Sequence, residues 1–311
     1  MLTGLHFLLT YQCNFECDHC FLYSGPRARG TFTLDQLRRV LDQAVELGTI
    51  TSVFFEGGEP MLYFPLLLAG LELARERGLK AGIVTNGYWA TSDADAELWL
   101  RPLAERGVTA IGLSDDGLHY GDAAGGHAER AQAAASRLGI EVKVMHTGQP
   151  AVKQATGGQA AGELDDGGVM FRGRAAEKLA PDLPTRPAAS LTRCPHEDLA
   201  SPQRVHVDCF GNLHPCQGLL MGNLWRMPLG QIVRDYDPQR HSIVGPLLAG
   251  GPAELARRYD LPIEPGYVDE CHLCFAARRA LLDRFPDLLA PRQVYGLPQN
   301  SERSILEPDG Q

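Results

Sequence analysis

Residues 4–20 read GLHFLLTYQCNFECDHC, an apolar run followed at once by three cysteines. The run from Gly4 to Thr10 predicts a β-strand, because bulky apolar residues dominate it. Cys13, Cys17 and Cys20 have the spacing C-x3-C-x2-C, close enough for one loop to aim three sulfurs at a common point. The alternative is three buried cysteines that pack as small hydrophobic residues.

The other five cysteines stand far along the chain, at positions 194, 209, 216, 271 and 274. Grouped thiols in a reducing compartment are typical of zinc or iron–sulfur ligands rather than of disulfides. The first group supplies three ligands, and a site with three protein ligands keeps a coordination position open for chemistry. Cys271 and Cys274 have the spacing of two ligands on one turn.

The chain has 311 residues, of which 44% are hydrophobic and 22% are charged, and its formal net charge is −9. At roughly 150 residues per domain, this length suggests two domains, or one barrel-sized domain with an appendage. The acidic balance argues against nucleic acid as a partner. No signal peptide begins the sequence, and no run approaches the roughly 20 apolar residues of a spanning helix. We therefore expect a cytoplasmic protein with no membrane partner.

Residues 5–145 alternate short β-rich runs with helical patterns, which predicts an α/β fold of repeated βα units on a parallel sheet. The expected strands are residues 4–10, 52–55, 81–85, 108–113 and 141–145, and the expected helices begin near Thr33, Pro65, Asp93 and Ala128. Each polar or glycine-rich motif falls at the carboxyl end of a strand, where parallel barrels build their active sites. The tight spacing favours a partial βα (TIM-like) barrel over an open doubly wound sheet.

The second half of the chain has a different character. Glycines crowd residues 148–168, which predicts a flexible loop or lid, and a proline-rich stretch over 181–195 marks a boundary. Residues 205–214 read as a hairpin around Gly211-Asn212. We expect the barrel to span residues 1–180 and a small, cysteine-rich α+β module to span residues 181–311.

The cysteine loop after the first strand, with Gly57-Gly58-Glu59-Pro60 after the second, resembles the radical S-adenosylmethionine (radical SAM) superfamily. The resemblance covers roughly residues 4–146. It implies that Cys13, Cys17 and Cys20 hold three irons of a 4Fe–4S cluster, whose fourth iron takes the amino and carboxylate groups of S-adenosylmethionine. Without the cysteines, Gly57 to Pro60 would be an ordinary turn.

The same resemblance implies cofactor contacts. His19 would lie near the adenine, Gly57 and Gly58 would let the backbone approach the methionyl ammonium, and Glu59 would be polar and nearby. Asn86 and Ser114, which follow the third and fourth strands, would contact the ribose or the carboxylate.

The implied activity is reductive cleavage of S-adenosylmethionine to a 5′-deoxyadenosyl radical, which abstracts hydrogen from a substrate. The family resemblance thus predicts an oxidoreductase or maturase, with a reductase such as flavodoxin or ferredoxin as the electron donor. The protein itself would bury the site and orient the substrate.

The second module resembles the auxiliary-cluster extension called SPASM, in its shortened Twitch form. The residues that carry this resemblance are Cys194, Gly211 and Cys216 spaced G-x4-C, and Cys271-x2-Cys274. It implies one auxiliary 4Fe–4S cluster with Cys194, Cys216, Cys271 and Cys274 as ligands. Cys209 is left over: it is a structural thiol, a replacement for Cys194, or a hydrogen-atom donor of the kind found in radical epimerases.

Other polar residues are candidates for substrate chemistry. Asp115, Asp116 and His119 form D-D-x-x-H at a strand end, where they could orient substrate or transfer a proton, although a solvated loop explains them equally well. His146 faces the same end. For Arg172 and Arg174, a salt-bridged surface pair is the expected role, and binding of a carboxylate or phosphate is the alternative.

Two substrate classes stay open, a peptide and a small metabolite, which the enzyme would oxidise, crosslink or epimerise. At 311 residues we expect no spare amino-terminal domain for a leader peptide, which favours a separate peptide-binding protein or a small molecule. A different class of function is a zinc-stapled binding protein without radical chemistry.

Overall fold

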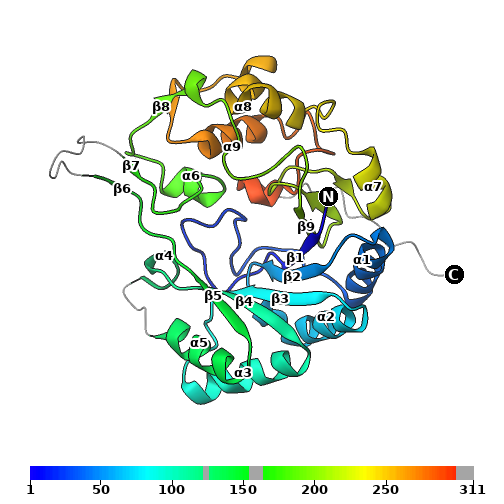
Figure 1. Cartoon of the computed structure of the whole chain (residues 1–311). Helices are drawn as coiled ribbons and strands as arrows, with labels where there is room; N and C mark the ends of the chain where they lie inside the picture. The colour runs from blue at the N-terminus through cyan, green and yellow to red at the C-terminus, as the bar shows by residue number, and fades with distance from the viewer. Residues whose placement is uncertain (122–125, 154–163, 299–311) are drawn as a thin grey trace.

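The computed structural model describes residues 1–121, 126–153 and 164–298, and within these residues one sheet of eight strands dominates the fold (Figure 1). The strand order is β11-β10-β9-β1-β2-β3-β4-β5. Strands β9 and β1 to β5 run parallel, and β10 and β11 are antiparallel to their neighbours. The bounds are β1 (Gly4–Thr10), β2 (Ser52–Gly57), β3 (Lys80–Thr85), β4 (Val108–Ser114), β5 (Glu141–Met145), β9 (Arg204–Asp208), β10 (Asn212–His214) and β11 (Gly222–Asn223). The predicted α/β fold with a partial barrel of parallel strands is confirmed.

Helices that connect the first strands cover one side of this sheet (Figure 1). They are α1 (Leu34–Leu47), α2 (Phe64–Glu76), α3 (Asp93–Glu105) and α5 (His127–Arg137), whereas the short η1 (Pro60–Tyr63) and α4 (Gly117–Tyr120) follow the carboxyl ends of β2 and β4. Helix α1 begins at a capping box in which Thr33 and Gln36 satisfy each other's backbone N–H, and it ends at Gly48 in the left-handed conformation. Its apolar stripe is buried against the sheet, as the sequence predicts.

The C-terminal part lies on the opposite side, above the carboxyl ends of the strands (Figure 1). Its elements are α6 (Arg174–Lys178), β8 (Arg186–Pro187), η3 (Ala188–Ser190), α7 (Leu229–Asp235), α8 (Val244–Arg258), β12 (Gly266–Tyr267), α9 (Glu270–Ala280) and η4 (Arg292–Tyr295). Helix α9 begins at Asp269, whose carboxylate accepts a hydrogen bond from the backbone N–H of His272. This cap places Cys271 and Cys274 on the first turns of the helix.

The predicted hairpin is formed by β9 and β10, and it joins the main sheet. Strand β9 pairs in parallel with β1, with Leu5 opposite Val205 and Phe7 opposite Val207. All four side chains are fully buried in one hydrophobic core, so pairing the two strands extends that core. One sheet therefore crosses the boundary expected at residue 180, and the division into two domains stays a prediction.

The two ends of the glycine-rich segment meet in a short antiparallel pair. Strands β6 (Ala151–Val152) and β7 (Leu164–Asp165) form it, and Gly148 N donates to Gly167 O at 2.7 Å. The centre of the expected lid, residues 154–163, lies outside the described residues. Among the residues that the structure describes, no helix is long and apolar enough to cross a membrane.

The loop after β2 packs directly against the loop after β1. Gly58 N donates to Thr10 O at 2.7 Å, and Glu59 N donates to Gln12 O at 2.9 Å. Gly57 has a φ of +126°, and a Cβ added at Gly58 would stand 2.1 Å from Gln12 O. The two glycines are therefore required for contact between the loops, in addition to the cofactor approach expected from the sequence.

We predict that Gly58→Ala lowers the free energy of unfolding by about 2 kcal/mol or more, because its methyl group meets a backbone carbonyl that cannot move aside. The midpoint of thermal unfolding should fall by roughly 5 °C or more. Gly117→Ala is the matched control, since a Cβ there meets open space. Equal midpoints for the two variants would contradict the argument.

Candidate metal and cofactor site

The first three cysteines lie on the loop that follows β1, between the sheet and the C-terminal part (Figure 1). Cys20 N donates to Cys17 O at 3.1 Å, which closes a turn. The pKa of Cys13 and of Cys17 is raised to about 12, chiefly by burial and in part by the neighbouring thiols of the loop. The three thiols therefore lie near enough to influence one another electrostatically, in a partly buried place on one loop.

Nitrogen donors face the sulfur of Cys13. Phe15 N lies 3.3 Å from Cys13 Sγ, and the Asn86 side-chain nitrogen lies 3.8 Å from the same sulfur and 2.9 Å from Asn14 Oδ1. Such donors favour an ionised sulfur and orient a ligand. Asn86, which we expected at the ribose or carboxylate, thus also contacts the cysteine loop.

Glu59 is fully buried, and the chain itself occupies both of its oxygens. Oε1 accepts hydrogen bonds from Met61 N at 3.0 Å and Thr85 Oγ1 at 2.8 Å, and Oε2 accepts from Asn86 N at 2.8 Å. Burial raises the pKa of Glu59 to about 7, while the three donors oppose the rise. This carboxyl group therefore fixes the end of β3, and with it Asn86, relative to the loop after β2.

His19 stands among the three cysteines and has an unused polar atom. Its Nδ1 is buried and has no hydrogen-bond partner among the residues that the structure describes, and its ring meets that of His119 edge to face, with centroids 4.5 Å apart. Burial, helped by His119, lowers the pKa of His19 to about 4. A neutral imidazole with an unpaired nitrogen suits the edge of a polar ligand.

Asp116 and His119 form a connected pair beside His19. The Asp116 carboxylate caps α4 by accepting from His119 N at 3.0 Å, and it also lies 2.8 Å from His119 Nδ1. Burial opposes ionisation of Asp116, but His119 outweighs it and keeps the pKa below its usual value. Polar atoms of His19, Asp116 and His119 lie within 4.8 Å of one another.

The remaining candidates at this edge lie on the neighbouring strand ends. His146 Nδ1 lies 2.6 Å from the carbonyl oxygen of Asp115, whose backbone N–H donates to Met145 O. Ser114 ends β4 opposite Met145 of β5. His146 therefore contacts the backbone of Asp115, whereas the side chains of Asp116 and His119 lie beside His19.

The second group of thiols lines one pocket in the C-terminal part, together with three arginines. Its cysteines are Cys194, Cys216, Cys271 and Cys274, and its arginines are Arg172, Arg278 and the exposed Arg193. Burial raises the pKa of Cys274 to about 11 and raises that of Cys194 and Cys271 as well. All four cysteines named from the sequence therefore meet, although they come from segments far apart in the chain.

Arg172 and Arg278 are buried in this pocket, so the expected surface role for Arg172 is wrong. Arg172 is 5% exposed and Arg278 is 2% exposed. Arg172 Nη1 lies 2.9 Å from Cys216 Sγ, and Arg278 Nη1 donates to Gln217 O at 2.9 Å. Because buried cations need negative partners, ionised sulfurs suit this pocket.

Arg174 is buried as well, and it holds the first cysteine loop. Its guanidinium donates to Cys17 O at 2.5 Å and to Ser24 O at 2.7 Å. A Cβ added at Gly173 would lie 2.5 Å from Phe21 Cα. Residues 172–174 thus run between the two thiol groups, and only their packing, not their sequence pattern, reveals this position.

Cys209 joins neither group of thiols. It is buried in the main hydrophobic core, where its sulfur would stand 2.8 Å from a Cβ added at Gly30. Burial raises its pKa well above the usual value.

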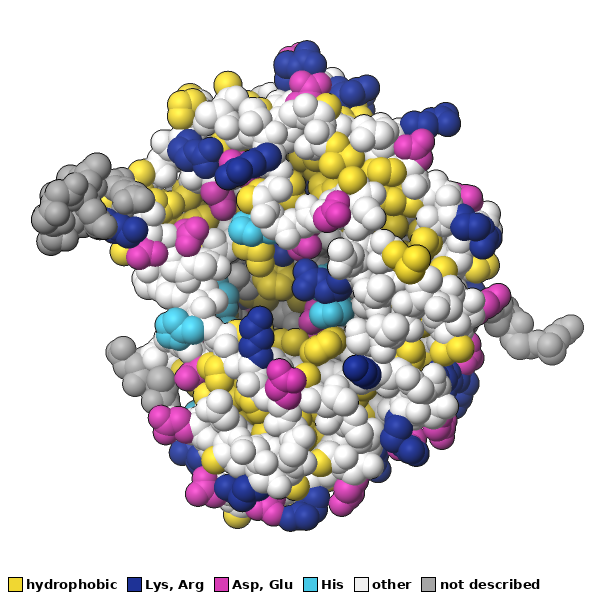
Figure 2. Space-filling model, in the orientation of Figure 1, with side chains coloured by type: hydrophobic (Ala, Val, Ile, Leu, Met, Phe, Trp, Pro, Cys, Tyr) yellow, Lys and Arg dark blue, Asp and Glu magenta, His cyan; other side chains and the backbone are white. Residues whose placement is uncertain are grey.

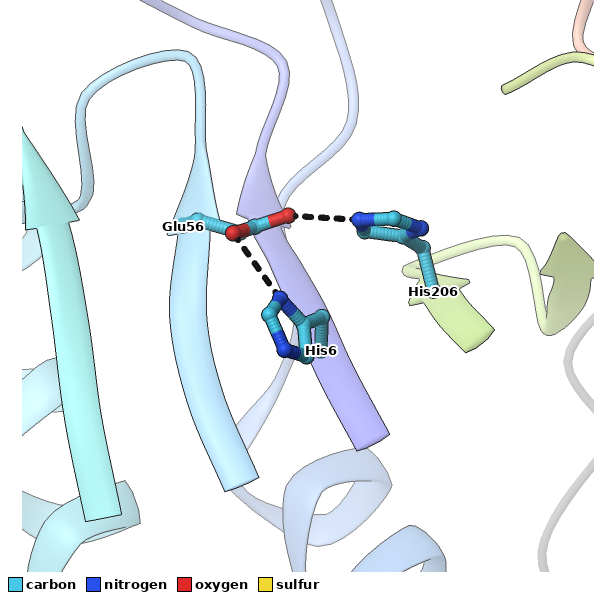
Figure 3. Close-up of side chains that lie close together, drawn as sticks. All are labelled: His6, Glu56 and His206. Carbon is cyan, nitrogen blue, oxygen red and sulfur yellow. Dashed lines mark hydrogen bonds and ion pairs between the residues drawn. The ribbon is translucent and has the colours of Figure 1, made fainter. Parts of the chain in front are cut away.

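A third polar group, which the sequence analysis missed, lies on three neighbouring strands (Figure 3). Glu56 Oε2 is 3.1 Å from His6 Nδ1, and Glu56 Oε1 is 2.9 Å from His206 Nε2. Burial opposes ionisation of Glu56, but the two imidazoles outweigh it and hold the pKa well below its usual range. The available signal was strand alternation, which puts His6 on the opposite face from Leu5 and Phe7.

The space-filling view shows a hollow between the sheet and the C-terminal part (Figure 2). Hydrophobic side chains form its floor, and histidine, basic and acidic side chains stand around it. An apolar cavity with a few polar groups is the usual form of a binding site.

We predict that Glu59→Gln lowers the free energy of unfolding by about 1–3 kcal/mol. The new amide NH2 group would face a backbone N–H that now donates a hydrogen bond to the carboxylate, and two donors cannot pair. The midpoint of thermal unfolding should fall by several degrees. Glu254→Gln, in an exposed i,i+3 pair with Arg257, is the control and should change little. A midpoint for Glu59→Gln no lower than that of the control would refute the buried acceptor role.

Three known proteins are similar to this chain, two in part of the sequence and one in fold. The antilisterial bacteriocin subtilosin biosynthesis protein AlbA of Bacillus subtilis is 33% identical over 81 residues, 26% of this chain and 18% of AlbA. The S-adenosylmethionine-dependent nucleotide dehydratase of Selenomonas ruminantium is 32% identical over 79 residues, 25% of this chain and 28% of that protein. The matches thus span less than a third of either relative. The structure of native anSMEcpe with bound AdoMet has a TM-score of 0.50 at 12% identity, over 92% of this chain and 98% of that one, which shows a common fold.

The family profile of the Radical SAM superfamily matches residues 7–152, which include the three-cysteine loop and the loop after β2. These residues include most of β1, all of β2 to β5 and the first group of thiols. Residues 7–152 therefore form a Radical SAM superfamily region of the chain.

Proposed function

We propose that this protein is a radical SAM enzyme that cleaves S-adenosylmethionine reductively and abstracts hydrogen from a peptide or small-metabolite substrate. The observation that carries the proposal is the buried group of Cys13, Cys17 and Cys20 with nitrogen donors on its sulfur. A 4Fe–4S cluster held by Cys13, Cys17 and Cys20 would supply the electron for reductive cleavage of S-adenosylmethionine.

The residues on this loop fit a cluster that has one open iron. They supply three thiols, and the buried Nδ1 of His19 beside them has no hydrogen-bond partner within the described part of the chain. An unpaired polar atom in such a place is costly unless a ligand meets it. We assign Cys13, Cys17 and Cys20 to the irons and His19 to the adenine of S-adenosylmethionine.

The chain's own contribution is to hold these groups still. Arg174 anchors the carbonyls of Cys17 and Ser24, and Glu59 holds Asn86 beside Cys13. Gly57 and Gly58 keep the loop after β2 in contact with the cysteine loop. Substrate orientation and proton transfer are assigned to Asp115, Asp116, His119 and His146 at the neighbouring strand ends, and Ser114 to contact with the cofactor.

We assign an auxiliary 4Fe–4S cluster to Cys194, Cys216, Cys271 and Cys274. The pocket supplies four thiols, which complete the ligand set of such a cluster. Arg172 and Arg278 support the assignment, because their buried positive charges would balance the negative charge of a thiolate-bound cluster. Removal of an electron from a substrate radical, or electron relay, is the role proposed for this site.

Two substrate classes are supported by different relatives. One relative is named for biosynthesis of a bacteriocin and another for dehydration of a nucleotide. We propose that the substrate is a peptide or small metabolite that is oxidised, crosslinked or epimerised, with a reductase such as flavodoxin or ferredoxin as electron donor. Cys209 is retained as the candidate hydrogen-atom donor.

The decisive experiment replaces Cys13, Cys17 and Cys20 together with Ala. We expect 5′-deoxyadenosine formation to be lost while about half of the iron remains, because one of two four-iron clusters is removed. Iron and acid-labile sulfide are measured after anaerobic purification, and cleavage is followed by chromatography. Cys209→Ala is the matched control and should keep the full iron content.

Retained 5′-deoxyadenosine formation in the triple variant would reject the assignment of the cleavage site. Stoichiometric zinc without sulfide in the unaltered protein would reject radical chemistry and favour a zinc-stapled binding protein.

The second experiment replaces Arg172 with Met. A cation beside Cys216 stabilises the reduced, more negative cluster, so its loss should make the auxiliary midpoint potential more negative by on the order of 100 mV. A redox titration followed by electron paramagnetic resonance measures the shift. Arg279→Met is the control, because Arg279 pairs with Glu177 at the surface. Equal potentials in the two variants would contradict the role of Arg172.

A further inference from the structure

We propose that His6, Glu56 and His206 form a binding site for one divalent transition-metal ion, separate from both groups of thiols. The site goes beyond the proposed function, because it uses none of the cysteines and none of the residues assigned to S-adenosylmethionine. Its three side chains come from β1, β2 and β9 and converge on one face of the sheet (Figure 3).

Strand register explains the convergence. His6 and His206 are direct partners in the β1–β9 pair, which sets their side chains next to each other on one face. Glu56 is the partner of Leu8, one repeat further along the β1–β2 pair, and its longer side chain reaches back between the two imidazoles. The arrangement follows from backbone pairing, so the three ligands are held by rigid elements.

The spacing of the polar atoms suits a metal ion. All three ligand atoms lie within 4.8 Å of one another, and the two oxygens of Glu56 lie 3.1 and 2.9 Å from the imidazole nitrogens. Bonds of about 2.1 Å from an ion to nitrogen and oxygen put neighbouring ligand atoms roughly 3.0–3.4 Å apart. Small side-chain rotations would therefore replace the two hydrogen bonds with three bonds to an ion.

The types of ligand indicate the class of ion. Two imidazoles and one carboxylate form the ligand set of many catalytic zinc sites and of non-haem iron sites, and both keep positions open for a further ligand. The absence of sulfur makes this group suitable for Mn²⁺, Fe²⁺, Co²⁺ or Zn²⁺, whereas the thiol groups select softer or clustered metals.

Burial of this group has a cost that packing does not explain. The side chains of His6 and Glu56 are each 15% exposed, and that of His206 is 10% exposed. The His6 ring stacks on Phe54 with centroids 4.9 Å apart, in a layer that barrels usually fill with apolar residues. Apolar residues would stabilise this layer at least as well as a buried charged group. Binding of a cation would explain why His6, Glu56 and His206 occupy it instead.

Mn²⁺ is the probe, because it prefers oxygen and nitrogen to sulfur and so avoids the thiols. The cluster-loaded protein is titrated anaerobically with Mn²⁺ in the oxidised state, where 4Fe–4S clusters are diamagnetic. The signal of free Mn²⁺ in electron paramagnetic resonance is then counted. We expect one Mn²⁺ per chain in the unaltered protein and an affinity roughly tenfold or more weaker in Glu56→Gln.

Asp116→Asn is the matched control, since it alters the other group of two histidines and a carboxylate, His19, Asp116 and His119. Binding of Mn²⁺ should persist in this control. His206→Asn, checked by circular dichroism, provides a second test if Glu56→Gln does not fold. The proposal is overturned if the unaltered protein binds no Mn²⁺, if neither Glu56→Gln nor His206→Asn weakens binding, or if Asp116→Asn abolishes it. Cleavage of S-adenosylmethionine is not part of this measurement, so failure of the proposed function would be recognised separately.

Discussion

The loops that follow β1 and β2 are joined by two backbone hydrogen bonds, from Gly58 to Thr10 and from Glu59 to Gln12. The other parts of the candidate site depend on this contact, because the first loop carries three cysteines and the second carries Glu59. The carboxyl group of Glu59 then holds the start of the loop after β3, where Asn86 meets Cys13. A side chain at Gly58 would separate the two loops, so the absence of a Cβ is a structural requirement here.

The second constraint is electrostatic and comes from three buried arginines. Arg174 holds the carbonyls of the first cysteine loop, while Arg172 and Arg278 lie among the four cysteines of the C-terminal pocket. Because Arg172 and Arg174 are neighbours in the chain, one short segment contacts both groups of thiols. Displacement of this segment would disturb both groups together, which makes it a natural place for coupling between them.

The first group of thiols could be predicted from the sequence, whereas the group of His6, Glu56 and His206 could not. The spacing of Cys13, Cys17 and Cys20 indicated a common site, because neighbouring ligands on one loop must lie close in space. Local patterns also predicted the parallel strands, the cap at Thr33 and the hairpin of β9 and β10. They did not predict that β9 would pair with β1, since strand pairing depends on partners distant in the chain, and so His6, Glu56 and His206 went unnoticed.

The sequence by itself determined the αβ alternation and the placement of Cys13, Cys17 and Cys20 on one loop, because helical and strand periodicity and short ligand spacings are local properties. The tertiary structure decided what those residues contact. It buried Arg172 and Arg174, which composition alone would place at the surface, and it tied both oxygens of Glu59 to the chain. Burial and long-range pairing arise only when distant segments pack, and they control charge, hydrogen bonding and access at every group described here.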